Sequence, residues 1–535
     1  MINCKKVENC FQDSQTYEYQ LPVDAAAFLA LLDDSWTTRC NYKLRRPVFI
    51  SERKGVHIKG ILAGDIIRVS FPDARSEENK NIFEYWLMDK FEDSKSPSPD
   101  RKGTYTKRPT SCKISNLDAW ICKSEGIPYL TADILKRLQL DKLNKVLRAK
   151  AKEPLTSLAE LSALPFATSR MLTESPGQFL LTSQSEISRV ISDNTSGTCG
   201  SSKRVFYTKK DLDNTVSFFA AGISEMLLPG EKVMIQFPHT GPSCLADLID
   251  QAVTKIGAES IPFSKEKSFG KQCVQLKEKR PDCYIGPPVF LLSLMRVYNY
   301  LYPEDTFPIT RALISGDACP QNVITALESS LHTKLFPHYG SRECGLGGAI
   351  TCPAHKGMHI RENHMIAEII DSDLHPVSPG IWGELVITTI GLAAMPLIRY
   401  RTGDYTRILP DPCPCGSVTK RLDHISRIIG SDDFPLSMEI LDNCLFTVPK
   451  LVDCQAAFTP EDDTLKIDAL VLDNSCKESL ENSLNIIFSP ELLSTQGFLS
   501  ARNSLPDRIQ IHLRTTLYRP GSVPFHHGKR VIFHT

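Results

Sequence analysis

The chain lacks an excess of charge of either sign, because 62 basic side chains balance 62 acidic ones over 535 residues. A protein whose main partner is nucleic acid or an anionic membrane favours a basic surplus, so the balance argues against both. The most apolar early run, residues 25–32, is too short to span a bilayer. The first residues also lack the apolar core of a signal peptide. We therefore expect a cytoplasmic protein.

The first 110 residues lack cysteines at the tight spacing of a metal site, and they contain no catalytic motif. The 17 cysteines of the chain are scattered, and an odd number cannot all pair within one chain. In a long cytosolic protein most of them should be reduced thiols, with a few free to bind metal. Residues 1–110 are interpreted as an N-terminal extension of unknown role.

Beyond residue 110 the sequence predicts an α/β fold, because helical and strand-like segments alternate along it. Residues 133–149 carry apolar side chains at helical spacing, and Thr131 can act as their N-cap. The chain length suggests about three domains. The alternating pattern predicts a core at 111–427, and the shorter mixed region after it predicts a small α+β C-terminal domain at 428–535. Strands are expected at 232–237, 283–286, 464–472 and 508–513, and a second helix at 477–487.

A loop dense in glycine and hydroxyl side chains follows the strand-like run at 189–191. Glycine lets backbone N–H groups turn toward an anion, hydroxyls add donors, and a nearby lysine adds charge. The loop is not a Walker loop, since G-x-x-x-x-G-K-[ST] is absent, and a polar turn is the alternative. The candidate phosphate-binding residues are Thr195, Ser196, Gly197, Thr198, Gly200 and Lys203.

Three further motifs suggest nucleotide chemistry, but each is weak evidence by itself. Glu343 lies among small residues at 339–348, and a carboxylate can anchor the Mg²⁺ that triphosphate chemistry needs. Asp404 lies in a Thr-Gly-Asp turn, where it can accept both hydroxyls of a ribose. Lys529, near the C-terminus, can enter an active site only if the small domain closes over it. The alternatives are a glycine-rich turn, a common polar turn and a frayed basic tail.

Cysteine and histidine spacing predicts a metal site. Cys352 and His355 form a C-x₂-H pair, and His359 lies seven residues past Cys352. Cys413 and Cys415 add a close thiolate pair. Together they fit tetrahedral zinc with no position left open for water, which is typical of a structural site. His355 and His359 compete for the fourth position, and reduced thiols in surface turns are the alternative.

Taken in order, these motifs resemble those of the acyl-adenylate-forming superfamily, specifically its phenylacetate–coenzyme A ligase branch. The similarity runs from Leu117-Asp118-Ala119-Trp120 to the C-terminus and is densest at 357–360 and 395–404. Jointly the motifs are highly specific. The resemblance implies a large multi-layer α/β core that binds ATP and an acid, and a small mobile α+β domain that closes over it as a lid. The N-terminal extension lies outside the resemblance.

The resemblance also implies roles for single residues. Glu343 would bind Mg²⁺, Asp404 would take the ribose hydroxyls, and Lys529 would bridge the substrate carboxylate and the α-phosphate. The partners would be ATP, coenzyme A and a carboxylic acid, with a homodimer left open. An apolar wall at 284–294 slightly favours an aromatic or other hydrophobic acid. Further nucleotide-site residues would be Gly316, Asp317, Ala318, His338, Tyr339, Gly340, Ser341 and Arg427.

The sequence departs from the family at the hinge between the two domains. After Ser426-Arg427, residues 428–435 lack the glycine-containing loop that in the family shapes the thioester-forming state. Adenylation is therefore better supported than transfer to coenzyme A. One alternative is an adenylating enzyme that passes the acyl or adenylyl group to another acceptor. Another is a zinc-stabilised, non-catalytic binding protein, against which the joint presence of Glu343, Asp404 and Lys529 argues.

Overall fold

The computed structural model of the protein describes residues 3–7, 15–29, 31–32, 36–41, 47–53, 55–72, 76, 79–80, 82–84, 86–87, 115–193, 203–262, 268–428, 436–487, 509–526 and 529–534. The chain forms two compact units, one from Met1–Ser111 with Gly126–Tyr129, the other from Cys112–Glu125 with Leu130–Thr535. Among the described helices, none combines the length and apolar character needed to cross a membrane.

The first unit is built on an antiparallel sheet with the strand order β1-β2-β6-β5-β4-β3. Side chains alternate along its strands, so that Phe49, Ile58 and Val69 share one buried face. Phe28 and Phe83 cover that face. Its elements are β1 (Asn3–Val7), β2 (Gln15–Gln20), α1 (Ala25–Leu29), β3 (Thr37–Asn41), β4 (Val48–Arg53), β5 (Val56–Ile61) and β6 (Ile66–Phe71).

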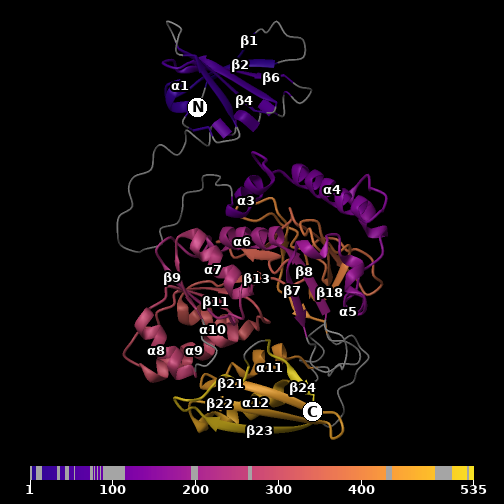
Figure 1. Ribbon diagram of the computed structural model, residues 1–535. Helices are drawn as coiled ribbons and strands as arrows, with labels where there is room; N and C mark the ends of the chain where they lie inside the picture. Colours follow the sequence, from indigo (N-terminus) through magenta and orange to yellow (C-terminus); the bar gives the residue numbers. More distant parts are fainter. Residues whose placement is uncertain are drawn as a thin grey trace. The chain divides into compact units, whose positions relative to one another are not determined.

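The second unit alternates helices and strands, as the sequence predicts (Figure 1). Its helices are α3 (Asn116–Glu125), α4 (Ala132–Ala149), α5 (Ser169–Glu174), α6 (Lys209–Ile223), α7 (Leu245–Ile256), α8 (Phe269–Lys279), α9 (Pro288–Leu301), α10 (Gln321–Leu331), α11 (Met438–Leu445) and α12 (Lys477–Ile487). Short 3₁₀ helices occur at Leu158–Ala163, Pro176–Phe179, Gln184–Glu186 and Asn474–Cys476.

The strands of this unit form several sheets. They are β7 (Ile187–Asp193), β8 (Lys203–Thr208), β9 (Lys232–Ile235), β10 (Glu259–Pro262), β11 (Cys283–Gly286), β12 (Arg311–Ile314), β13 (Phe336–Tyr339), β14 (Ala349–Thr351), β15 (Met358–Ile360), β16 (Met365–Ile370), β17 (Gly383–Thr389), β18 (Tyr400–Thr406), β19 (Arg421–Leu422), β20 (Ser426–Arg427), β21 (Leu451–Thr459), β22 (Thr464–Val471), β23 (Gln510–Leu517) and β24 (Ile532–His534).

Local predictions are confirmed where the sequence pattern was strong. The helix at 133–149 is α4, and the Thr131 side chain accepts a hydrogen bond from the Ile134 N–H, as an N-cap does. The strand at 283–286 is β11, and the helix at 477–487 is α12. The remaining expected strands differ from β9, β22 and β23 only at their ends.

The central sheet has the order β10-β9-β11-β12-β13-β14-β15-β19, and the strands from β10 to β13 are parallel. Both of its faces are covered. Val233 and Ile285 pack with α6 and α7, whereas Met234 and Tyr284 pack with α8 and α9. Burial on both faces explains why these strands read as continuous apolar runs.

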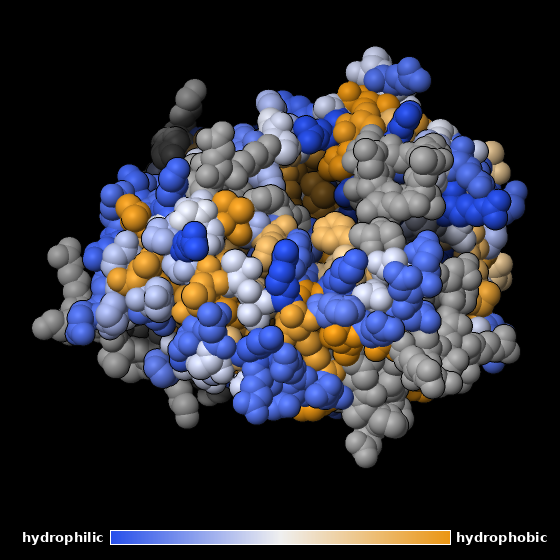
Figure 2. Space-filling model, turned by 90° about the horizontal axis from the view of Figure 1, so that it is seen from below, coloured by the Kyte–Doolittle hydropathy of each residue, from blue (hydrophilic) through white to orange (hydrophobic). Residues whose placement is uncertain are grey.

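The C-terminal region is a small α+β layer. Its sheet has the order β23-β22-β21-β24 and packs with α11 and α12. It shares one hydrophobic core with α8, α9 and α10, and α9 lies against β21 (Figure 1). The view from below shows hydrophobic residues interspersed with hydrophilic ones among the coloured residues of this side (Figure 2).

A buried arginine, Arg530, links the C-terminal region to the turn after β12 of the large α/β part. The Arg530 guanidinium donates to both Asp442 carboxylate oxygens at 2.7 Å and to Asp453 Oδ1 at 2.7 Å. Its backbone N–H donates to Asp317 Oδ2 in the core at 3.0 Å. Bidentate charge-assisted bonds of this kind are strong and directional. Arg530 therefore joins α11, β21 and the turn after β12 in one network.

We predict that Arg530→Ala destabilises the second unit by about 3–5 kcal/mol, because two buried carboxylates lose their counter-charge. Urea unfolding, followed by hydrogen exchange of α11 and β21, measures the change. Arg514→Ala is the matched control, because Arg514 pairs with Asp468 on the same sheet but is 76% exposed. It should cost about 1 kcal/mol or less. Equal losses in both variants would contradict the role given to Arg530.

Candidate active site

A cavity of about 100 Å³ lies where the parallel strands end. Phe237 follows β9, Pro287 follows β11, and Asp317 follows β12, and all three line the cavity. Ligands of open α/β sheets bind beyond the carboxyl ends of the strands, because the chain leaves the sheet there in loops. The opposite wall comes from the C-terminal region and includes Pro524 and Lys529.

The turn after β12 borders the cavity with Gly316 and Asp317. Gly316 has φ +87°, and a Cβ there would lie 2.5 Å from the Phe237 ring, so the turn requires glycine. Asp317 Oδ1 accepts the Ala318 N–H at 2.9 Å. Burial raises the pKa of Asp317 to about 6, although its two backbone donors act to lower it. Of the predicted residues 316–318, Gly316 and Asp317 thus border the cavity.

The next strand, β13, carries two predicted residues, His338 and Tyr339. His338 Nδ1 lies 2.8 Å from Ser315 Oγ, and burial lowers the pKa of His338 to about 4, so the ring is neutral at pH 7. The Tyr339 hydroxyl donates to Asp404 Oδ2 at 2.8 Å. Gly340 directly follows the strand. The bond from Tyr339 joins β13 to β18, and Asp404 lies within that strand rather than in the turn predicted from the sequence.

Asp404 lies in β18 and has a second partner. Arg427 in β20 donates to Asp404 Oδ1 at 2.9 Å and to the Thr402 carbonyl at 2.6 Å. An ionised carboxylate has about four acceptor positions, so both oxygens keep capacity for further donors. The structure therefore brings together Asp404, Arg427 and Tyr339, three of the predicted nucleotide-site residues.

Glu343 is buried in the turn after β13 and forms an ion pair with Lys203 at the start of β8. Lys203 Nζ also donates to the Tyr400 hydroxyl at 3.3 Å, and that hydroxyl donates to Glu343 Oε1 at 3.2 Å. Burial acts to raise the pKa of Glu343, but the ammonium of Lys203 outweighs it and holds the pKa below its usual range. Nearby, the Ser341 N–H donates to Cys344 Sγ at 3.1 Å.

Part of the predicted phosphate loop cannot be placed. Thr195, Ser196, Gly197, Thr198 and Gly200 lie outside the described residues, and so do 429–435 of the predicted hinge. Lys203, the last residue of the loop motif, is the member that the structure does place.

Sequence reasoning missed several residues around the cavity. Asp453 in β21 lines it and pairs with Arg530, but nothing in a strand pattern marks such an aspartate. Gln236, directly after β9, also lines it. Tyr400 lies inside a motif that the sequence analysis quoted, and its contact with both Lys203 and Glu343 requires the fold to be known.

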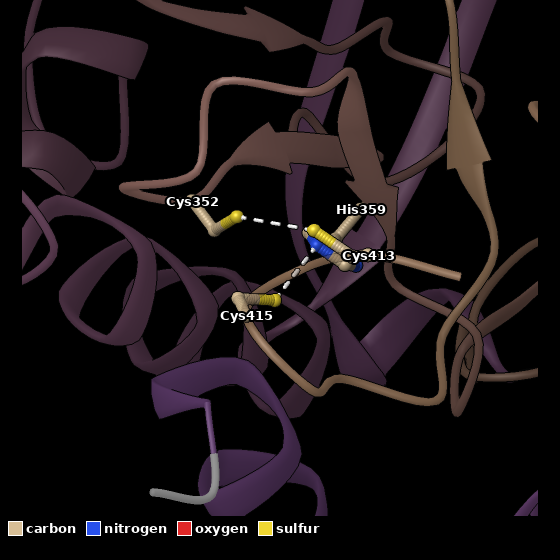
Figure 3. A group of neighbouring side chains, drawn as sticks. All are labelled: Cys352, His359, Cys413 and Cys415. Carbon is tan, nitrogen blue, oxygen red and sulfur yellow. Dashed lines mark hydrogen bonds between the residues drawn. The ribbon is translucent and has the colours of Figure 1, made fainter. Parts of the chain in front are cut away.

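A second cluster comprises Cys352, His359, Cys413 and Cys415, whose ligand atoms all lie within 4.8 Å of one another (Figure 3). Cys352 Sγ lies 3.6 Å from Cys413 Sγ, and Cys415 Sγ lies 3.4 Å from His359 Nε2. Zinc–sulfur bonds of about 2.3 Å in a tetrahedron place sulfurs roughly 3.8 Å apart. Three thiol groups and one imidazole therefore fit structural zinc.

His359 and His355 no longer compete for the fourth position. His355 is not a member of the cluster, because its Nδ1 lies 2.9 Å from the Leu335 carbonyl oxygen and its ring lies against Phe336. In His359, by contrast, Nδ1 lies 2.9 Å from Thr419 Oγ1. The other ring nitrogen, Nε2, therefore faces the thiols. Orientation of a ligating histidine by a bond to its other nitrogen is usual at metal sites.

Comparison of the sequence with known proteins finds similarity to phenylacetate–coenzyme A ligases. The chain is 29% identical over 344 residues to a phenylacetate–coenzyme A ligase of Aromatoleum evansii, covering 59% of this chain and 77% of that protein. It is 25% identical over 396 residues to one of Thermus thermophilus, covering 70% and 86%. No protein-family model matches.

Among solved structures, the fold matches a 2-hydroxyisobutyryl-CoA ligase in complex with R3-HIB-AMP. The TM-score is 0.60 at 16% identity, over 76% of this chain and 90% of that one. The fold is thus the α/β fold of adenylate-forming ligases. The resemblance to the phenylacetate–coenzyme A ligase branch, predicted from the sequence, is confirmed.

We predict that Lys203→Met destabilises the protein by about 3–5 kcal/mol at pH 7, because Glu343 is left buried without its counter-charge. The pKa of Glu343 lies below its unfolded value, so the ion pair contributes above pH 4.5 and is lost as the pH falls. The difference in unfolding free energy between wild type and variant should therefore shrink between pH 7 and pH 4. Lys334→Met, an exposed lysine paired with Glu328, is the control. A pH-independent difference would reduce Lys203 to a packing role.

The thiol–imidazole cluster predicts about one zinc per chain in elemental analysis of the purified protein. Cys413→Ser should lose the metal and lower the thermal unfolding midpoint, and a chelator should do the same to wild type. His355→Ala serves as control and should keep its zinc. Protein that folds and unfolds normally without any bound metal would rule out a structural zinc.

Proposed function

We propose that the protein is an AMP-forming acid ligase. It joins a carboxylic acid to the α-phosphate of ATP with release of pyrophosphate, and then passes the acyl group to coenzyme A with release of AMP. The observation that carries this proposal is the meeting of Lys529 with the Gly316–Asp317 turn at one cavity on the carboxyl edge of the sheet. Its phenylacetate–coenzyme A ligase relatives in several bacteria add support.

Asp404 is the proposed acceptor for the ribose hydroxyls. Tyr339 and Arg427 hold one carboxylate oxygen each, so the group is fixed in orientation. A fixed acceptor binds two neighbouring hydroxyls without first losing side-chain freedom. The glycine turn at Gly316 and the neutral His338 ring are proposed to border the adenine.

Glu343 is the proposed anchor of Mg²⁺. The Lys203 ammonium keeps this buried carboxylate ionised while no metal is bound, so it is ready for a cation. Bound Mg²⁺ would supply positive charge at the triphosphate. Lys203 would then be free to turn toward the pyrophosphate, together with the loop residues Thr195 to Gly200.

Lys529 is the proposed catalytic cation. A carboxylate that attacks an α-phosphate brings two anions together, and negative charge grows on the phosphate oxygens in the transition state. An ammonium group placed between them offsets that charge without needing to reorganise. Lys529 borders the cavity directly, and its neighbour Arg530 fixes the backbone at that point.

The acceptor is proposed to be coenzyme A. The acyl-adenylate has AMP as a good leaving group, so a thiolate can attack its carbonyl and form a thioester. The altered hinge at 428–435 favours a second candidate, transfer of the acyl or adenylyl group to another acceptor. Both candidates require the same first step.

We also propose the organisation of the chain around this activity. Residues 111–427 form the adenylation core, 428–535 form the lid, and 1–110 are an accessory domain. The Cys352–His359–Cys413–Cys415 cluster is proposed to bind a structural zinc, because all four ligand positions come from the protein.

Exchange of labelled pyrophosphate into ATP over a panel of carboxylic acids tests the first step. Acid-dependent exchange is the expected result, followed by release of AMP when coenzyme A is added. Exchange without a thioester would favour the second acceptor class. No exchange with any acid, from protein that binds ATP, would contradict the proposed function.

We predict that Lys529→Ala lowers the acid-dependent exchange rate by at least about a hundredfold, because the transition-state charge loses its main side-chain cation. Circular dichroism should stay unchanged, since Lys529 is exposed. Lys477→Ala, an exposed lysine on α12 of the same region, is the control and should exchange at the wild-type rate. Normal exchange by Lys529→Ala would refute the role.

A further inference from the structure

The wall of the cavity beside the sheet is mainly apolar. Phe237 and Val289 line it, and Phe290 stacks on Phe269 with ring centroids 5.7 Å apart. Such a wall suits a hydrophobic part of the acid that the proposed function requires.

Gln236 interrupts this wall. It lines the cavity, yet it is only 6% exposed, and among the described residues its Oε1 has no hydrogen-bond partner. Its backbone, in contrast, is satisfied, because the N–H donates to the Ile285 carbonyl at 2.8 Å. A buried polar atom without a partner costs free energy, so it is rarely kept unless something else pairs with it.

The surrounding chain is shaped around this glutamine. A Cβ on Gly286, at the end of the neighbouring strand β11, would lie 2.6 Å from the Gln236 Cβ. Gly286 therefore leaves the space that the Gln236 side chain needs. The amide can turn to present its donor or its acceptor end to an occupant of the cavity.

Ser293 on α9 is the second polar side chain of this wall. It is 1% exposed and lines the cavity, and its hydroxyl donates to the Val289 carbonyl at 2.9 Å. Its oxygen can still accept a hydrogen bond. The wall thus offers one amide and one acceptor within an apolar surround.

We propose that Gln236 selects the acid: the substrate is a small aromatic acid that carries a hydroxyl or amino group, and this group hydrogen-bonds the Gln236 amide. The inference rests on the proposed function and deepens it by naming the substrate class. An unsubstituted acid leaves the amide unpaired when it displaces water from the cavity. A site built to hydrogen-bond a substrate group discriminates strongly against the analogue that lacks it.

Matched acid pairs test the proposal: phenylacetate against its 3-hydroxy, 4-hydroxy and 4-amino derivatives, and benzoate against the same derivatives. With the wild-type protein, we expect at least one substituted acid to exceed its parent about ten- to a hundredfold in kcat/KM for pyrophosphate exchange. Equal rates for substituted and parent acids would overturn the proposal.

Two variants locate the preference. Gln236→Met keeps the length of the side chain without its hydrogen bonds, and it should lose the preference mainly through KM of the substituted acid. Gln272→Met replaces another buried glutamine that does not line the cavity, and it should keep the preference. A Gln236→Met protein that still prefers the substituted acid would overturn the assignment to this residue.

Calorimetric binding of the same acids separates this proposal from the proposed function. Tighter binding of a substituted acid by wild type, without any exchange, would support the Gln236 site and contradict the ligase. Binding without preference, or no binding of any of these acids, would overturn the Gln236 proposal even if another acid supports exchange.

Discussion

The buried Arg530 network is the constraint on which the placement of the C-terminal region depends. Two buried carboxylates, Asp442 and Asp453, lie in the region that shares a hydrophobic core with the core helices, and among the described residues the Arg530 guanidinium forms an ion pair with both. Removing such charges from water is costly, so separating Arg530 from either aspartate would leave an uncompensated buried charge. Because the Arg530 N–H also donates to Asp317, this network holds the neighbouring Lys529 at the cavity.

The rest of the site follows from the sheet. Parallel strands end at one edge, so residues far apart in the chain meet there without any long loop having to be ordered. Two ion pairs form beside the end of β13: Glu343, which follows β13, pairs with Lys203, and Asp404, which accepts from Tyr339 of β13, pairs with Arg427. The Lys203 ammonium holds the pKa of Glu343 below its usual range, which favours the ionised state in which a carboxylate binds magnesium. Without a nucleotide, the carboxylates of Glu343 and Asp404 are therefore held in ion pairs; these are the groups proposed to bind Mg²⁺ and the ribose.

The helices and buried strands could be predicted from the sequence wherever a residue pattern has one physical meaning. The helical spacing behind Thr131 and the apolar runs of the buried strands predicted elements that the structure contains. Spacing alone left His355 and His359 equal, because only the fold shows which imidazole faces the thiols. Gln236 and Asp453 carry no motif, since their importance comes from burial and from neighbours on other strands.

Acid-dependent pyrophosphate exchange by Arg530→Lys tests the central claim most directly. Lysine keeps the charge but loses the planar fork that binds both aspartates. If the network is what presents Lys529, exchange should fall at least about tenfold while circular dichroism stays the same, and Arg514→Lys should exchange normally. An Arg530→Lys protein that exchanges at the wild-type rate would contradict the account.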